Sequence, residues 1–266
     1  MRNTLIALAF LFSINAWSQC EPEMKAFKVG ENLQYDVYYN WGIIWLHAGE
    51  VFFKVQEANY NSQQVYHFYS AGSSFKSYDW IYKVRDTFQT YVDKQKFKPL
   101  YFSRINYEGG YEVDNQYKFN YTGNAITSKT WNSKSEEKRQ ILNLKSCTFD
   151  VLSIIYFART LKYEQYKLNE KIPITVIIDG EIHDLYIRYL GKEKIKSKDG
   201  NKYNCIKFSP LLVEGTIFSG GEDMTVWVTD DANRVPILVE AKILVGSIKT
   251  YLREAENLVN PPLRVN

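Results

Sequence analysis

The side chains that could carry catalytic or metal chemistry are few in this sequence and widely spaced. Histidine occurs only as His47, His67 and His183. None of them has a partner at a zinc-ligand spacing such as HExxH, so the sequence predicts no metal site and no cofactor. The GxSxG, P-loop and GxGxxG patterns are also missing, which counts against nucleophile-elbow hydrolases and nucleotide-binding folds.

Acidic side chains offer two further candidates. Glu181 and His183 share one face of a predicted strand while Asp184 points to the other, so an exposed hairpin tip explains them better than an acid–base pair. The run 230–233, DDAN, has oxygen atoms that could bind calcium, but it lacks the loop glycine and distal glutamate of an EF-hand. A polar turn explains the same residues with fewer assumptions.

Aromatic residues are the other unusual feature. They make up 16% of the chain and include 21 tyrosines. β-propensity accounts for most of this, because tyrosine suits half-buried strand faces. The sharper interpretation is an aromatic-lined groove for a sugar or an acyl chain, since flat rings combine apolar contact with a polar rim.

The stretch 224–252, MTVWVTDDANRVPILVEAKILVGSIKTYL, indicates the kind of element that would position these side chains. Met224, Val226 and Val228 recur at the two-residue period of a strand, and a polar turn at 230–234 follows. The alternation then resumes and changes phase at Gly246, which predicts a β-bulge in one long, bent second strand. A bent strand of about fifteen residues suits a strongly curved or barrel-like sheet.

Similar alternation predicts antiparallel strands along nearly the whole chain. The Asp179-Gly180 pair between two apolar runs is among the strongest hairpin signals. The run 133–139, SKSEEKR, interrupts the pattern and predicts a solvated, mobile loop.

One segment has the pattern of a helix. Val151 to Leu161 is apolar around most of a helical circumference, which predicts a largely buried helix capped by Thr148 or Asp150. Arg159 lies on this helix and needs a carboxylate or carbonyl partner if it is buried. The sequence therefore predicts a mainly β protein, with a strongly curved antiparallel sheet or partly open barrel wrapping one buried helix.

Residues 1–19 have the features of an export signal, with Arg2 before the short apolar core Leu5 to Phe12 and a polar end at Gln19. Cleavage after Gln19 is favoured over lipidation of Cys20, because the residue before a lipidated cysteine is normally small. This leaves 20–266 as a single β-rich exported domain of the periplasm or cell envelope. No later stretch is apolar enough to span a membrane, and a net charge of +3 does not indicate nucleic-acid binding.

Cys147 and Cys205 are candidates for a disulfide in an exported chain. Their bridge would close a loop of about sixty residues, for which the chain-entropy relation gives roughly 4 kcal/mol of stabilisation. Two buried free thiols are the alternative.

Short sequence patterns cover nearly the whole chain beyond the export signal. They are Gly30-Glu31 with Leu33 and Tyr35, Ala48-Gly49-Glu50, Phe97-Lys98-Pro99-Leu100, Glu108-Gly109-Gly110, Phe149-Asp150-Val151-Leu152-Ser153 with Tyr156 and Arg159, Cys205-Ile206-Lys207-Phe208, and Val226-Trp227-Val228 with Asp231 and Arg234-Val235-Pro236. Together they resemble the exported family known as domain of unknown function 3108. The resemblance implies a β-rich envelope protein, and it supplies neither an activity nor functional residues.

Two hypotheses about function remain open. In the preferred one, a non-enzymatic envelope protein binds a lipid-like or other apolar ligand, or an envelope partner, and Tyr156, Phe157 and Trp227 line a cavity at an open end of the sheet. In the alternative, a hydrolase of an envelope polymer uses carboxylates such as Asp86 or Glu108 as acid and base. Glycoside hydrolysis needs two carboxylates roughly 5 to 10 Å apart, and the sequence contains no pair that must meet.

Overall fold

The computed structural model describes residues 22, 25–41, 43–198, 200–215 and 219–261 of the 266-residue chain. The predicted export signal, its cleavage position after Gln19 and the alternative lipidation site at Cys20 lie outside the described residues. The described part is mainly β and contains one sheet of 15 strands. None of its helices is long and apolar enough to cross a bilayer.

Short strands and turns account for most of the described chain. The strands are β1 (Asn32–Trp41), β2 (Ile44–Tyr60), β3 (Gln63–Ser74), β4 (Val84–Asp93), β5 (Pro99–Glu108), β6 (Tyr111–Asn120), β7 (Ala125–Asn132), β8 (Ser135–Asn143), β9 (Thr148–Asp150), β10 (Lys171–Ile178), β11 (Glu181–Lys196), β12 (Lys202–Pro210), β13 (Met224–Thr229), β14 (Pro236–Lys242) and β15 (Ser247–Glu256). The helical segments are η1 (Lys76–Tyr78), α1 (Asp79–Tyr82), α2 (Ser153–Thr160) and η2 (Tyr163–Gln165).

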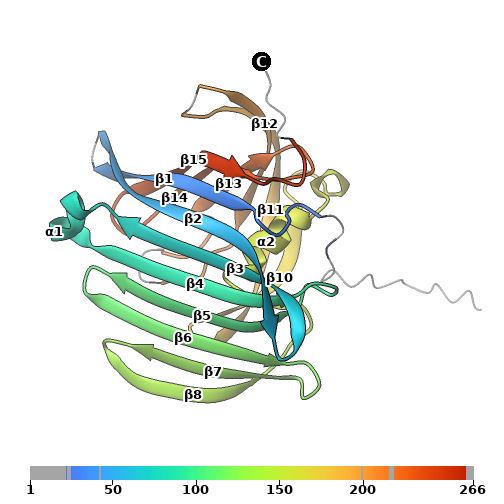
Figure 1. Cartoon of the computed structure of the whole chain (residues 1–266). Helices are drawn as coiled ribbons and strands as arrows, with labels where there is room; N and C mark the ends of the chain where they lie inside the picture. The colour runs from blue at the N-terminus through green and yellow to red at the C-terminus, as the bar shows by residue number, and fades with distance from the viewer. Residues whose placement is uncertain (1–21, 23–24, 42, 199, 216–218, 262–266) are drawn as a thin grey trace, which may run out of the picture.

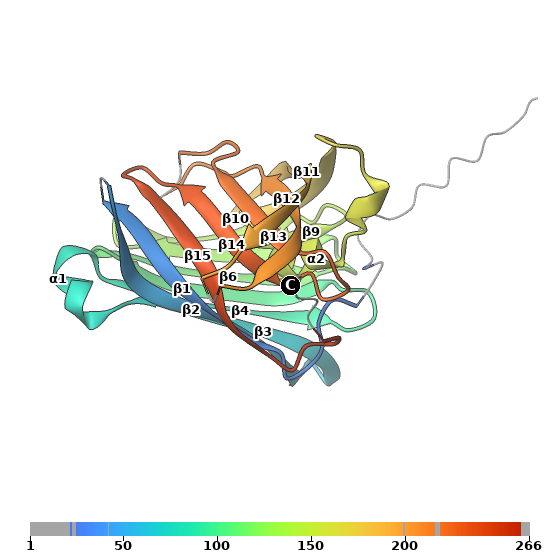
Figure 2. The ribbon, with the colours of Figure 1, turned by 90° about the horizontal axis from the view of Figure 1, so that it is seen from above.

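The strand order explains the shape of the sheet. It runs β8-β7-β6-β5-β4-β3-β2-β1-β15-β14-β13-β12-β11-β10-β9, so β1 and β15 pair in the middle. Neighbours are antiparallel except β9, which runs parallel to β10. The sheet curves so that its two halves face each other across a concave side (Figure 1, Figure 2). Contacts such as the hydrogen bond from Thr90 Oγ1 to Asp150 Oδ2, at 2.8 Å, connect the two halves. β8 and β9 are the outer strands, so the large curved sheet is not closed, and the mainly β prediction is confirmed.

The hairpin predicted at 224–252 is confirmed in its first half and wrong in its second. β13 and β14 pair across the polar turn. The phase change at Gly246 is not a bulge, because β14 ends at Lys242 and the chain reverses so that β15 pairs antiparallel with β14. Gly246 has φ of 87°, and a Cβ there would lie 2.7 Å from Asn40 O, so this tight reversal requires glycine.

Helix α2 corresponds to the helix predicted at Val151 to Leu161, although it is shorter. Six of its eight residues are buried, and Tyr156, Phe157 and Ala158 belong to the main hydrophobic cluster. The carboxylate of Asp150 accepts the backbone N–H groups of Leu152 and Ser153, both at 2.9 Å. Of the two caps predicted for this helix, Asp150 is therefore the one that satisfies its first N–H groups.

Arg159 connects α2 to two distant parts of the chain. It donates to both carboxylate oxygens of Glu31, at 2.6 and 2.9 Å, and to the carbonyl oxygens of Ala26 and Asn233. The side chains of Arg159 and Glu31 are only 3% and 0% exposed. The prediction that a buried Arg159 needs carboxylate or carbonyl partners is confirmed.

The predicted disulfide between Cys147 and Cys205 is wrong. Cys205 is a free, fully buried thiol on β12, and it packs in a small cluster with Trp227 and Leu238. Cys147 instead packs against the main hydrophobic cluster. The loop-length relation concerns only the sequence separation of two cysteines, whereas the fold sets the distance between them.

We expect Cys205 to resist alkylation in the folded protein. Burial raises the pKa of its thiol to about 12, so little reactive thiolate exists at neutral pH. Iodoacetamide labelling followed by peptide mapping checks this, and modification of Cys205 should require denaturation. Rapid labelling under native conditions, or a peptide linking Cys147 to Cys205, would contradict the buried free thiol.

Candidate functional site

A row of polar side chains lies on the inner face of β4 to β6, toward the α1 end of these strands. The strand register places Asp86 opposite Asn106 and Arg104 opposite Asn115, so these four side chains share one face of the sheet. Phe102 lies on the same face of β5 and belongs to the main hydrophobic cluster. The inner face therefore changes from apolar to polar along β5.

The tip of the β10–β11 hairpin packs against this polar row. The carboxylate of Asp179 pairs with Arg104 and accepts a hydrogen bond from Asn115 Nδ2 at 2.9 Å. The backbone N–H of Gly180 donates to Tyr117 Oη at 3.1 Å. Asp179 and Gly180 have positive φ angles of 50° and 80°, as a tight Asp-Gly hairpin turn requires. The predicted hairpin is confirmed, and its tip crosses the concavity.

Asp86 and Glu108 form a carboxyl pair beside the hairpin tip. Asp86 is hydrogen-bonded to Glu108, and Asn106 Nδ2 donates to Glu108 Oε1 at 3.1 Å. Burial, and then the neighbouring charge of Glu108, raises the pKa of Asp86 from 3.8 to about 7. Near neutral pH the carboxyl of Asp86 is therefore partly protonated, so it can donate as well as accept a hydrogen bond.

Five buried polar atoms on the inner face of β4 to β7 have no hydrogen-bond partner within the described part of the chain. They are Asp86 Oδ1, Arg104 Nε, Asn106 Oδ1, Asn115 Oδ1 and Ser128 Oγ. Asn106, Asn115 and Ser128 are 7%, 1% and 0% exposed. Each buried group left unpaired costs about 1 to 3 kcal/mol, so five together indicate a surface suited to a polar ligand.

An open cavity of about 450 Å³ adjoins Glu108 and Asp179, and its volume is within the size range of small-ligand sites. It is lined by Tyr82, Glu108, Tyr111, Lys134, Asp179 and Gly215. Glu108 and Asp179 connect the cavity to the buried polar row. Gly109 helps to place the ring of Tyr82, because a Cβ at this position would lie 2.3 Å from the ring. Two tyrosine rings, two carboxylates and one ammonium group thus surround the cavity.

A second cavity, of about 280 Å³, lies near the other ends of β4 to β7. Its lining includes Phe97, Tyr121, Leu144, Cys147 and Phe149. None of the five unpartnered atoms belongs to a lining residue of either cavity, but Glu108 and Asp179 of the larger cavity contact Asn106, Arg104 and Asn115, which carry three of these atoms. The larger cavity is therefore the better candidate site.

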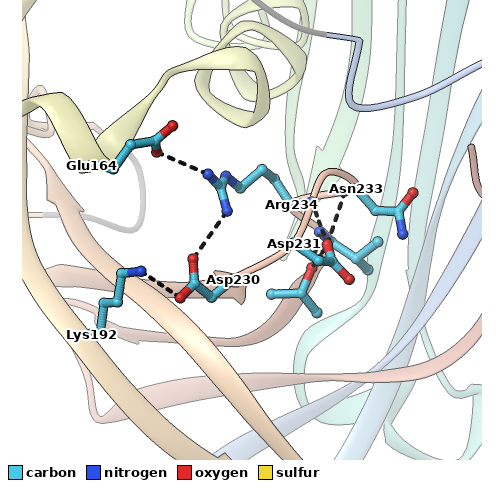
Figure 3. A network of polar contacts seen from close by, with 8 residues as sticks. Glu164, Lys192, Asp230, Asp231, Asn233 and Arg234 are labelled. Carbon is cyan, nitrogen blue, oxygen red and sulfur yellow. Dashed lines mark hydrogen bonds and ion pairs between the residues drawn. The ribbon is translucent and has the colours of Figure 1, made fainter. Parts of the chain in front are cut away.

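The charged residues at the β13–β14 turn stabilise the fold (Figure 3). Arg234 pairs with Glu164 at 3.1 Å and with Asp230 at 3.3 Å, and Lys192 pairs with Asp230 at 2.6 Å. Asp231 Oδ1 accepts two backbone N–H groups of the turn. The predicted polar turn at 230–233 is confirmed, and its carboxylates have partners within the protein. Among the described residues, no three His, Cys, Asp or Glu side chains converge as metal ligands.

The structure does not bring together the three aromatic residues predicted to line a cavity. Tyr156 and Phe157 are buried in the main cluster, where Tyr156 stacks on Phe68 at 3.8 Å between ring centroids. Trp227 lies on the opposite face of β13 from Val228, and its Nε1 donates to Glu193 at 2.9 Å. Neither of the two cavities has any of the three in its lining.

The sequence alone does not single out Arg104, Asn115 or Ser128. The usable signal is the polar series Arg104, Asn106 and Glu108, which continues the face of Phe102 along one strand. A strand face that points inward and becomes polar toward the end of the strand is typical of a cavity mouth lined by polar side chains. The signal becomes usable only when the fold shows which face of the strand is inward.

An open, strongly curved sheet with a polar cavity places the molecule among β-barrel-like proteins. A crystal structure of a beta-barrel-like protein of domain of unknown function DUF1849 from Brucella abortus is similar to it, with a TM-score of 0.57 and 12% sequence identity. The match covers 89% of this chain and 100% of that chain, and at this identity it shows the fold alone. The model of the family described as protein of unknown function (DUF3108) matches residues 34–253, so the chain belongs to that family. The chain has no match among curated proteins.

Proposed function

We propose that this protein is a non-enzymatic protein of the cell envelope that binds a polar, hydroxyl-rich ligand, such as a carbohydrate group, in the larger cavity. The main support is the set of five unpartnered buried polar atoms on the sheet face that Glu108 and Asp179 connect to that cavity. Export to the periplasm or cell envelope is part of the proposal, because residues 1–19 have the features of an export signal.

The chemistry around the cavity matches that of a sugar. Asn106 and Asn115 offer amide oxygens as acceptors, and Arg104 Nε offers a donor. A ligand with closely spaced hydroxyl groups both donates and accepts, so it can satisfy all three. The rings of Tyr82 and Tyr111 add flat apolar faces against which a sugar ring can pack.

A polar ligand is favoured over the apolar ligand suggested by the aromatic content. An apolar chain in this cavity would leave the buried amides unpaired, at a cost of about 1 to 3 kcal/mol each. In this proposal the sheet wraps around α2, and the helix fills that part of the concavity with buried side chains such as Tyr156. The ligand is then restricted to the end of the sheet that holds Tyr82 and Glu108.

A hydrolase is the second candidate, because Asp86 and Glu108 lie together. A carboxyl with a pKa of about 7, as at Asp86, would suit a general acid. However, two hydrogen-bonded carboxyl groups are closer than the roughly 5 to 10 Å over which a carboxylate pair flanks a glycosidic bond. Binding is therefore better supported than hydrolysis.

We expect Ser128→Ala to stabilise the ligand-free protein by about 1 kcal/mol, because it removes a fully buried hydroxyl that has no partner. Ser103→Ala is the matched control. Its hydroxyl accepts a hydrogen bond from Gln89 Nε2 at 3.1 Å, so its removal should destabilise by about 1 kcal/mol. Urea denaturation of both variants measures the sign of each change in the free energy of unfolding. Destabilisation by Ser128→Ala would contradict our interpretation of the site.

Native mass spectrometry of protein purified from its own envelope tests the ligand. We expect an adduct of carbohydrate mass on the wild type and on Ser103→Ala, with lower occupancy on Tyr111→Ala, which removes a ring that lines the cavity. Equal occupancy on all three proteins, an adduct of purely acyl-chain mass, or a clean ligand-free mass under gentle conditions would each count against the proposal.

A further inference from the structure

Exposed apolar side chains surround the end of the sheet that holds the larger cavity, and we propose that this rim docks the protein on a lipid bilayer containing anionic headgroups. The rim is formed by the β1–β2 turn, the β14–β15 turn and the α1 segment. Its apolar side chains are Ile43, Ile44, Trp80, Ile81, Leu244 and Val245. The inference depends on this rim and not on the ligand proposed for the cavity.

Contacts between strands bring the two turns and the α1 segment to one end of the sheet. Tyr39 Oη donates to Val245 O at 3.0 Å, and Asn40 pairs with Ser247, so the β14–β15 turn lies beside the β1–β2 hairpin. The backbone N–H of Phe75 donates to Ala48 O at 2.9 Å, which connects the segment before α1 to β2. Figure 1 shows α1 at the same end as the turn between β1 and β2.

These side chains project into solvent. Ile43 is 98% exposed, Trp80 82% and Val245 73%. Surface turns usually carry Gly, Asn, Asp, Ser or Pro, so large apolar residues in three neighbouring turns are unexpected. A group of exposed apolar residues of this kind marks an interaction site.

Basic groups lie close to the apolar side chains. Lys76 and Lys83 are exposed on either side of α1. Lys249 Nζ lies 5.0 Å from the ring centroid of Trp45, and it pairs with Glu240 at 2.6 Å. The carboxylate of α1, Asp79, is held by Arg85 at 2.6 Å. Ammonium groups behind an apolar surface complement anionic headgroups, and lysine can extend its charge toward them.

Separate projecting turns fit a bilayer better than a protein surface. A protein interface is a continuous, closely packed patch, whereas each turn can enter the boundary between headgroups and acyl chains independently. Tryptophan is favoured at that boundary. Tyr82 belongs to α1 and also lines the cavity, so docking through the rim would direct the cavity opening toward the membrane.

Co-sedimentation with vesicles of phosphatidylethanolamine and phosphatidylglycerol tests the proposal. The variant is Ile43→Ser with Trp80→Ser, and the control is Ile105→Ser with Ile141→Ser, two isoleucines outside the rim that are 62% and 77% exposed. We expect the wild type and the control to bind equally and the rim variant to bind at least about tenfold more weakly. Vesicles of phosphatidylcholine alone should bind less protein than the anionic vesicles.

Protein freed of bound adducts should be used, so that the vesicle result does not depend on the ligand. Absence of sedimentation with anionic vesicles, or equal binding of the rim variant, would overturn membrane docking. Analytical ultracentrifugation tests the alternative that a second copy of this chain covers the rim. Self-association that the rim substitutions abolish, in protein that does not bind vesicles, would show that another copy covers the rim and would also overturn the proposal.

Discussion

Replacing Arg159 with methionine is expected to destabilise the protein by about 3 to 5 kcal/mol, because the carboxylate of Glu31 would remain buried without its charged partner. The substitution also removes the hydrogen bonds from Arg159 to the carbonyl oxygens of Ala26 and Asn233. These bonds connect α2 to the segment before β1 and to the β13–β14 turn. The midpoint of urea denaturation should therefore shift strongly.

Two further variants test whether burial of the Arg159–Glu31 pair explains this loss of stability. Arg188→Met breaks a partly exposed pair with Glu222 and is expected to cost much less stability than Arg159→Met. Combining Arg159→Met with Glu31→Leu removes both buried charges and should recover much of the loss. The interpretation fails if Arg159→Met costs no more than Arg188→Met.

Replacing Asp86 with asparagine is expected to stabilise the protein progressively as pH rises from about 4 to about 7. In the wild type, the pKa of Asp86 is raised from 3.8 to about 7, mainly by burial, so the folded state binds this proton more tightly than the unfolded state. The free energy of unfolding therefore falls as pH rises through this window. The full difference is at most about 4 kcal/mol, and solvent screening reduces it. Asparagine has no proton to lose.

Urea denaturation of both proteins between about pH 4 and pH 8 measures this effect. Asp184→Asn is a control of opposite sign. Hydrogen bonds from Lys145, and then from Thr175, hold the pKa of Asp184 below its ordinary value, so this aspartate stabilises the folded state increasingly above that lowered pKa. A stability difference between wild type and Asp86→Asn that does not change with pH would contradict a protonated, buried Asp86.

Local sequence patterns determined much of the fold. Two-residue alternation predicted antiparallel strands, and the Asp179-Gly180 pair predicted a hairpin, because both depend on neighbouring residues. The apolar pattern predicted a largely buried helix, and Arg159 on it was expected to need a carboxylate or carbonyl partner if buried, as the pair with Glu31 provides. In each case the physical cause lies within one element.

Other features depended on the surroundings of each segment. A phase change at Gly246 is compatible with a bulge or with a chain reversal, and only the pairing of β15 with both β14 and β1 decides for reversal. The run 133–139 was expected to be a mobile loop, but it forms a turn and the start of β8. As an outer strand of the sheet, β8 tolerates charges that discourage further pairing.

Asp86 and Glu108 could be chosen from the sequence as candidate acid and base, but the sequence could not predict that their carboxyl groups lie together. They are neighbours because β4 and β5 pair in one register, and Asp179 joins them because a hairpin from the other half of the sheet crosses the concavity. Alternation along a strand determines which side chains share a face. Curvature of the whole sheet decides which face is inward, and therefore which polar atoms are buried without a partner, because burial depends on contacts between strands far apart in the chain.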